Sequence, residues 1–175
     1  PWTTSFTEDS FGNIWIGTYR NGTFCFHKNQ TPFQKSMSGK NIECMSTDHS
    51  GNYWIGSLNG EVCVLDSTQK QIMGKTIFPN DMIHTICGQE SSNKVWVGTM
   101  YGLYEAWIES NKQIVYQKTS GINIPSIRSI VQDSCFLWIA SYNNGVTLYN
   151  YSTQQSVVTY KTDSEVLPLP SNTIR

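Results

Sequence analysis

The chain has 175 residues and a formal net charge of −1 at pH 7, with 12 basic and 13 acidic side chains spread along its length. The lack of a basic run or stripe argues against nucleic acid or an anionic membrane surface as a partner, and no apolar run approaches the roughly 20 residues that cross a membrane. Aromatic residues make up 13% and charged residues 14%, a balance typical of many short strands packed on one another.

One tetrapeptide recurs four times, as Trp-Ile-Gly-Thr, Trp-Ile-Gly-Ser, Trp-Val-Gly-Thr and Trp-Ile-Ala-Ser. Steps of 39, 42 and 42 residues separate its copies, which begin at Trp15, Trp54, Trp96 and Trp138. A glycine follows each tryptophan after six or seven residues. A period near 40 with β-forming residues is typical of the four-stranded blade of a β-propeller.

The first two copies follow strong hairpin signals, at residues 9–13 and 48–52. The third and fourth copies lack the Asp-x-x-Gly-Asn pattern of these turns. The aspartates at this place could suggest converging carboxylates, but an Asp at a hairpin entry usually bonds its own backbone. We therefore interpret Asp9, Asp48 and Asp133 as turn residues.

The fourth repeat shows the strands of one blade. Apolar and β-branched runs predict strands at residues 127–133, 136–141, 146–151 and 156–160, joined by short turns. No segment carries a helical period with caps, so the chain is predicted to be all-β. It would form about four four-stranded antiparallel blades in a single partial propeller array. We place the blades at residues 1–41, 42–82, 83–126 and 127–168, with 169–175 starting a further blade.

The tetrapeptide also predicts how blades pack. Burying one tryptophan removes about 150–250 Å² from water, worth at most about 4–6 kcal/mol. The Gly (or Ala140) two residues later lies on the same strand face and lets the neighbouring backbone approach closely. The Thr or Ser that ends the tetrapeptide is expected to satisfy a polar group at the strand end.

Residues 8–18 with Asn21 and Gly22, residues 48–57 with Gly60, and residues 95–103 resemble the two-component regulator propeller repeat. Residues 169–175 resemble the opening strand of a further copy. The chain departs from the pattern at Ala140, where Gly is usual, and at Thr23 and Glu61, where Leu usually follows the blade glycine.

The resemblance implies an origin in the extracytoplasmic sensor region of a hybrid two-component histidine kinase of a Bacteroides-type bacterium. Such regions hold seven-bladed propellers, followed by an immunoglobulin-like domain, a membrane span and cytoplasmic kinase and receiver domains. This chain, which opens on Pro1 without an initiator Met, would be an excised piece of a periplasmic sensor for glycan fragments. Because four blades do not close such a ring, we expect an open arc that self-associates through propeller surfaces, rather than a small four-bladed ring.

Residues that carry catalysis or bind metals show no convergent pattern. His27, His49 and His84 occupy different repeat positions, so neither a metal cluster nor a base–nucleophile pair is indicated. The five cysteines are odd in number and lack C-x-x-C spacing, which argues against a zinc site or a disulfide framework. We expect no cofactor and no catalytic residue in this piece.

The loops after the tetrapeptide strands are the predicted binding region, since they gather at one end of a propeller. Aromatic rings stack on the apolar face of a sugar, and Arg and Asn hold hydroxyl groups. The candidates are Tyr19, Arg20, Asn59, Tyr101, Tyr142 and Asn143, from loops that also contain Asn21, Leu58, Met100 and Asn144. The alternative is that these are ordinary turn and rim residues.

The leading hypothesis is a non-enzymatic sensor module that binds an oligosaccharide. One alternative is a propeller enzyme, a lyase or glycosidase, with catalytic groups in the central funnel. Another is a structural propeller that binds proteins. An acid–base pair or metal set at the funnel would favour the enzyme, and the sequence shows none.

Overall fold

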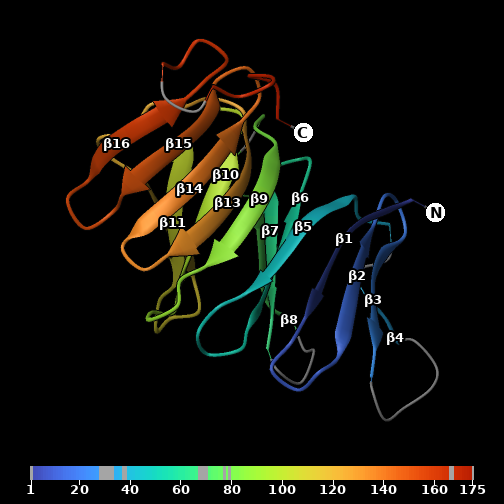
Figure 1. The fold of residues 1–175 in the computed structure, drawn as a ribbon. Coiled ribbons are helices and arrows are strands. Elements are labelled where there is room, and N and C mark those ends of the chain that lie inside the picture. Colours follow the sequence, from blue (N-terminus) through green and yellow to red (C-terminus); the bar gives the residue numbers. More distant parts are fainter. Residues whose placement is uncertain are drawn as a thin grey trace.

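The computed structural model describes residues 2–27, 34–36, 39–66, 71–76, 78, 80–165 and 168–174. These residues form four four-stranded antiparallel sheets and contain no helix, so the all-β prediction is confirmed (Figure 1). Within the described part there is accordingly no helix of the length and apolarity needed to span a bilayer.

Sheet 1 contains β1 (Thr3–Glu8), β2 (Ile14–Thr18), β3 (Gly22–Phe26) and β4 (Gln34–Ser36). Sheet 2 contains β5 (Ile42–Thr47), β6 (Tyr53–Ser57), β7 (Glu61–Leu65) and β8 (Gln71–Thr76). Sheet 3 contains β9 (Ile83–Gly88), β10 (Lys94–Thr99), β11 (Leu103–Ile108) and β12 (Ile114–Lys118). Sheet 4 contains β13 (Ile127–Asp133), β14 (Phe136–Ser141), β15 (Gly145–Asn150) and β16 (Gln155–Tyr160).

Each sheet is a meander in which consecutive strands pair, and the four sheets follow one another in an arc (Figure 1). The first strands β1, β5, β9 and β13 contact one another from sheet to sheet and form the inner edge of the arc. The tetrapeptides lie on the second strands, β2, β6, β10 and β14. The hydroxyl group that ends each tetrapeptide satisfies a polar group at the strand end, as predicted. It donates to a carbonyl oxygen at the start of the third strand or just before it, at 2.7–3.3 Å, from Thr18, Ser57, Thr99 and Ser141.

The pairing of first and second strands shifts at the same place in every sheet. The residue left out of the ladder is Thr4 in β1, Glu43 in β5, His84 in β9 and Arg128 in β13. A β-bulge of this kind bends its strand and re-aims the side chain of the extra residue. The inner edge of the arc therefore carries one bulged residue per sheet.

Three hydrophobic clusters fill the spaces between consecutive sheets, and one tetrapeptide tryptophan lies in each. Trp15, Trp54 and Trp96 are at most 4% exposed, so the packing prediction is confirmed for these three. The small residue two positions later meets a side chain rather than backbone, which corrects the prediction. A Cβ on Gly98 would lie 2.6 Å from Cγ2 of Ile127 on the next sheet.

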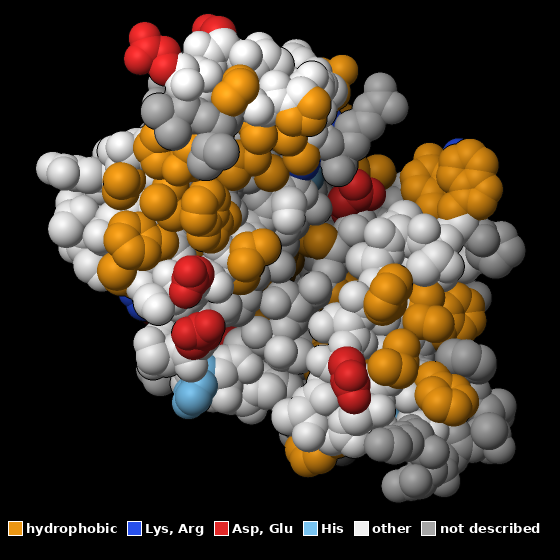
Figure 2. Space-filling view, viewed as in Figure 1, with side chains coloured by type: hydrophobic (Ala, Val, Ile, Leu, Met, Phe, Trp, Pro, Cys, Tyr) orange, Lys and Arg blue, Asp and Glu red, His pale blue; other side chains and the backbone are white. Residues whose placement is uncertain are grey.

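The fourth tryptophan does not follow the prediction. Trp138 is 37% exposed and stacks on Tyr160 of its own sheet, with ring centroids 6.2 Å apart, because no described sheet packs on this face. At the other end of the arc Phe6 of β1 is 77% exposed. Hydrophobic side chains are visible at both ends of the molecule (Figure 2).

Candidate functional site

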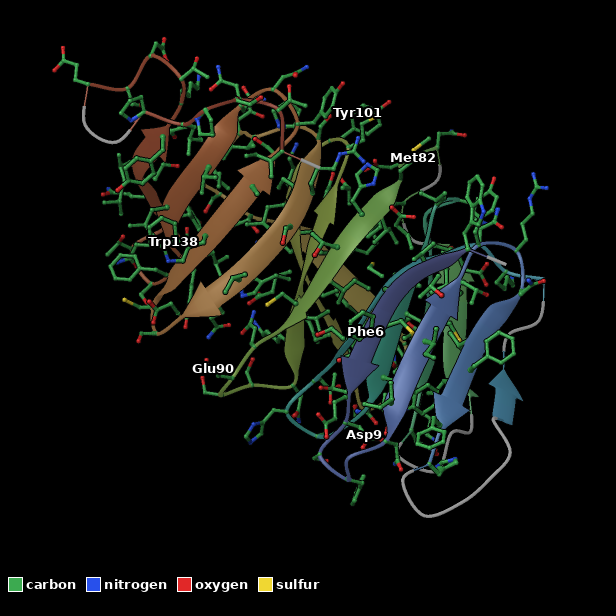
Figure 3. All side chains as sticks on the ribbon, turned by 45° about the vertical axis from the view of Figure 1, so that its right-hand side comes forward. Phe6, Asp9, Met82, Glu90, Tyr101 and Trp138 are labelled. Atoms are coloured by element: carbon green, nitrogen blue, oxygen red, sulfur yellow. The ribbon has the colours of Figure 1, made fainter. Side chains whose placement is uncertain are left out.

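The loops that follow the tetrapeptide strands lie on one side of the arc, where the second strands end; this side is called the loop end. Figure 3 shows Tyr101 at this end, beside Met82 from the segment that leads into β9, whereas Asp9 and Glu90 lie in the first hairpin turns at the opposite end. Two backbone bonds tie the first end together, from Met100 N to Met82 O at 3.2 Å and from Ser126 N to Met100 O at 2.7 Å. The Met100 loop is thus tied both to the segment that enters its own sheet and to the segment that enters the next sheet.

The loop of sheet 1 forms a pocket of about 560 Å³ lined by Trp2, Tyr19, Arg20 and Asn21, the Tyr19 pocket. Trp2 and Tyr19 stack with ring centroids 6.3 Å apart and planes inclined by 26°. The guanidinium of Arg20 lies 5.0 Å from the centre of the Tyr19 ring. Three predicted loop residues therefore come together here, joined by Trp2, which the sequence did not single out.

The remaining predicted residues are spread over the other loops. The side-chain oxygen of Asn59 accepts bonds from Ser57 Oγ and from the backbone N–H of Glu61, so it supports its own turn. Asn143 has a φ of 69° and accepts a bond from Thr173 Oγ1 at 2.8 Å. Tyr101 is 59% exposed. These three lie in turns or at the exposed rim, and Tyr142 lines a further pocket.

That second pocket, the inner pocket, has a volume of about 460 Å³ and is lined by Glu43, His84, Arg128 and Tyr142. Three of the four described residues that line it are the bulged residues of β5, β9 and β13. Three different sheets therefore contribute one ionisable side chain each to a single pocket at the inner edge. Sequence analysis did not find this cluster.

Arg128 is held between two rings. Its Nη1 lies 3.0 Å from Nδ1 and 3.2 Å from Nε2 of His84. Because these nitrogens flank the same ring carbon, Nη1 reaches both, and its N–H donates to the nitrogen that carries no proton in the neutral ring. On its other contact the guanidinium carbon is 5.4 Å from the centre of the Tyr142 ring. The Tyr142 contact helps to fix the guanidinium without using its N–H donors.

One donor of Arg128 is left without a partner. Its Nε is buried and has no hydrogen-bond partner among the described residues. Glu43 forms no ion pair with the Arg128 guanidinium. The two ion pairs found among the described residues are Lys40–Glu61 and Lys94–Glu105. Guanidinium and carboxylate thus line the same pocket without touching each other.

The surroundings shift both other ionisable groups of the inner pocket toward their neutral forms. Burial, together with the charge of Arg128, lowers the pKa of His84 against the opposing effect of Asp81. Burial raises the pKa of the Glu43 carboxyl, and the charge of Arg128 opposes this rise only in part. At neutral pH the imidazole is therefore uncharged, and one of its nitrogens can accept from the guanidinium.

A simple signal could have revealed the inner pocket. Glu43, His84 and Arg128 each follow directly on an isoleucine that opens the first strand. They lie 11, 12 and 10 residues before their tryptophans, because the hairpin turns differ in length. Alignment on the isoleucines, instead of on the tryptophans, would have placed all three at one repeat position.

The first hairpin turns, on the side opposite the loop end, contain the predicted turn aspartates. The interpretation as turn residues is confirmed for Asp9 and Asp48. Asp9 Oδ1 accepts bonds from the backbone N–H of Phe11 and Asn13, both at 2.9 Å. Its Oδ2 also accepts from Trp15 Nε1 at 3.2 Å and from Tyr53 Oη at 2.6 Å. The carboxylate therefore serves the turn and the core at once.

None of the five cysteines, all in the described part of the chain, forms a disulfide. Burial raises the pKa of the Cys25 and Cys63 thiols to about 11, which suits packed, unreactive side chains. Within the described ranges no group of three or more His, Cys, Asp or Glu side chains could hold a metal ion.

Residues 1–20 match the profile of the family described as Two component regulator propeller. A comparison with curated proteins gives no match. Among solved structures, the chain is similar to the extracellular domain of BT3049, described as a hybrid two component system of B. thetaiotaomicron, with a TM-score of 0.71 and 24% identity over 91% of this chain and 22% of that one. It is also similar to an auxiliary nutrient binding protein from Bacteroides thetaiotaomicron, with a TM-score of 0.71 and 13% identity over 90% of this chain and 46% of the other.

A third likeness is to the extracellular domain of BT4673, again described as a hybrid two component system of B. thetaiotaomicron, with a TM-score of 0.66 and 19% identity over 89% of this chain and 24% of that one. The chain spans less than half the length of each of these proteins. At these identities the likenesses show the fold: the four sheets are blades of a β-propeller. The match at residues 1–20 covers β1, the Asp9 turn and the first tetrapeptide, and the repeat that begins the chain is therefore a two-component regulator propeller repeat.

Proposed function

We propose that the chain is part of a ligand-sensing propeller in the periplasmic region of a hybrid two-component sensor histidine kinase. The observation that carries the proposal is the regulator-propeller repeat at residues 1–20 in a chain that shares its fold with extracellular domains of two such systems. In this role the propeller binds and rearranges, while phosphoryl transfer belongs to other parts of the protein.

We further propose glycan fragments as the ligands. The support is the chemistry of the loop end, where the Tyr19 pocket offers two stacked aromatic rings beside Arg20 and Asn21. Flat rings with adjacent amide and guanidinium donors suit the apolar face and the hydroxyl groups of a sugar.

Two experiments test this function. The gene around this segment is expected to encode a membrane span followed by histidine-kinase and receiver domains; a catalytic domain in their place would overturn the sensor role. Calorimetry of the 175-residue chain against neutral and acidic oligosaccharides is expected to detect binding that Tyr19→Ala, Tyr101→Ala or Tyr142→Ala weakens. If all three variants bind as tightly as the parent chain, the loop assignment is wrong.

Self-association is part of the same proposal. The two ends of the arc expose apolar side chains such as Phe6 and Trp138, and covering them would remove apolar surface from water. Sedimentation at increasing protein concentration is expected to show dimers or larger species. A monomer at all concentrations would show that the arc is stable with both ends open.

A second candidate function is cleavage of a uronate-containing glycan by β-elimination, which the inner pocket favours. In this reaction a base removes the proton beside the carboxylate, a cation stabilises the charge that develops, and the leaving group departs from the next carbon. His84 would be the base and Arg128 the cation. Incubation with polygalacturonate tests it: unsaturated product, absorbing in the ultraviolet and lost in His84→Ala, is the expected sign. A glycosidase would need two carboxylates, and Glu43 is the one carboxylate among the described residues that line the pocket.

A further inference from the structure

The inner pocket is built by a device that the whole array shares. All four first strands carry a β-bulge at the same position, but the residue differs from sheet to sheet, as Thr4, Glu43, His84 and Arg128. A bulge that served the fold alone would need no particular side chain. Three of the four carry ionisable groups, and these three share one pocket.

The bulged residue of sheet 1 is a useful contrast. Thr4 Oγ1 donates to the carbonyl oxygen of Ile42 at 2.6 Å and so ties sheet 1 to the start of β5. Its polar group is satisfied by the protein. Arg128 is satisfied only in part: its Nη1 contacts the ring nitrogens of His84, its contact with Tyr142 is through the ring face, and its Nε is buried without a partner among the described residues.

The charges of the pocket balance. Glu43 and Arg128, of opposite charge, line the pocket together with the neutral His84, whose strand β9 contacts both β5 and β13. A ligand with a net charge would meet a like charge on one side. A group that can both donate and accept hydrogen bonds satisfies both sides, and a sugar hydroxyl does so.

We propose that the inner pocket binds one neutral saccharide residue, whose hydroxyl groups donate to Glu43 and accept from Arg128. The proposal rests on the sensor function and names the place and the chemical class of its ligand. The volume of about 460 Å³ lies within the range of about 300–1,000 Å³ found for small-molecule sites. Tyr142 and His84 hold the guanidinium, so they act as positioning residues.

Variants of the two charged residues test the proposal. Glu43→Gln keeps the shape but removes the charge, and Arg128→Lys keeps the charge but removes the planar donor fork. The 175-residue chain is titrated by calorimetry with cellotriose, xylotriose, mannotriose and trigalacturonic acid. We expect a neutral trisaccharide to bind, and each variant to weaken it about tenfold or more, as the loss of a hydrogen bond to a charged group does. Glu90→Gln, an exposed glutamate in the hairpin turn at the opposite end, is the matched control and should change the affinity less than about twofold.

Histidine ring signals in NMR give a second readout that does not depend on variants. His84 lines the pocket, whereas His49 lies in the first hairpin turn of sheet 2, at the opposite end. The bound saccharide is expected to shift the His84 signals and to leave those of His49 in place. The unfolding midpoint of each variant is measured alongside, and Glu43→Asp replaces Glu43→Gln should the latter not fold.

The outcomes separate the two proposals. Saccharide binding that neither variant weakens, with unshifted His84 signals, would overturn the inner pocket as the site and leave the sensor function standing. Preferential binding of trigalacturonic acid would overturn the neutral ligand class and favour the uronate chemistry of the second candidate. If no saccharide binds, the glycan-sensing function and the inner pocket fail together.

Discussion

Sheets 1 and 2 hold their tryptophans differently from sheets 3 and 4. Asp48 Oδ2 accepts the indole N–H of Trp54 at 2.9 Å, as Asp9 does for Trp15. In sheet 3 Gln89 stands at the turn, and the buried Nε1 of Trp96 has no partner in the part of the chain that the structure describes. In sheet 4 both the turn aspartate and the tryptophan are exposed.

The comparison of the sheets shows that packing of the tryptophan and hydrogen bonding of its indole N–H come from different parts of the repeat. The tetrapeptide supplies apolar area for packing, and three of its four copies use it. The turn ahead of it supplies the acceptor for the polar end of the tryptophan, and only the first two copies do so. A buried donor without a partner costs about 1–3 kcal/mol. Burial of Trp96 therefore stabilises the fold less than burial of Trp15 or Trp54 does.

The largest expected effect is the loss of the Asp48 carboxylate. It accepts from Asn52 N at 3.0 Å, from Asn52 Nδ2 at 2.9 Å and from the Trp54 indole. We expect Asp48→Ala to lower the free energy of unfolding by about 3 kcal/mol, since three donors lose their acceptor and one lies in the core. Urea titration measures it. Asp133→Ala is the matched control, with an expected loss below about 0.5 kcal/mol; equal losses would contradict the comparison.

The second largest effect on stability is expected when Asp9 is protonated at low pH. Burial raises the pKa of this carboxyl, but the bonds from Tyr53, Asn13 and Trp15 outweigh burial and lower the pKa from 3.8 to about 2. A pKa lowered by folding contributes stability above the unfolded value, and this stability is lost as the pH falls through the folded one. The contribution is about 2 kcal/mol, lost between about pH 4 and pH 2.

Asp9→Asn measures this contribution directly. The amide does not titrate, so the difference in the free energy of unfolding between the parent chain and Asp9→Asn should shrink by about 2 kcal/mol on going from pH 6 to pH 2. A difference that stays constant with pH would mean that the charge of Asp9 is not what the turn requires.

The fold could be predicted because the tryptophan period is a local signal repeated four times, and strand patterns and turns are local as well. The exposure of Trp138 could not be, since burial depends on which sheet packs on that face. The partner of an indole N–H is also a tertiary fact: Asp9 reaches Trp15 only because the hairpin brings residues six apart into contact.

The Tyr19 pocket and the inner pocket also differ in whether a local sequence signal reveals them. Tyr19, Arg20 and Asn21 are adjacent in sequence, and the prediction that they form a binding surface required only that their loop be exposed. Glu43, His84 and Arg128 are about 40 residues apart in sequence and meet through bulges on neighbouring strands. A bulge is set by the pairing of two strands and leaves little trace in either strand alone.

Replacement of a tryptophan by phenylalanine sharpens the comparison of sheets 2 and 3. Trp54→Phe removes buried area and leaves the Asp48 carboxylate with an unused acceptor, whereas Trp96→Phe removes similar area together with an unpaired donor. We expect Trp96→Phe to cost about 1 kcal/mol less than Trp54→Phe in the free energy of unfolding. A larger cost for Trp96→Phe would show that its indole N–H has a partner in solution, such as an ordered water molecule.

The smallest effect is expected at Trp138. Its ring is 37% exposed and rests on Tyr160, and a phenyl ring can keep that contact, so Trp138→Phe should change the free energy of unfolding by about 0.5 kcal/mol or less. The measurement is made at several protein concentrations, because self-association that covers this face would add stability by mass action. A loss that is small in dilute solution but grows with concentration would show that Trp138 packs between copies of the chain, as the other three tryptophans pack between sheets. A large loss at every concentration would contradict the comparison, since Trp138 would then be as important to its own sheet as Trp54 is to sheet 2.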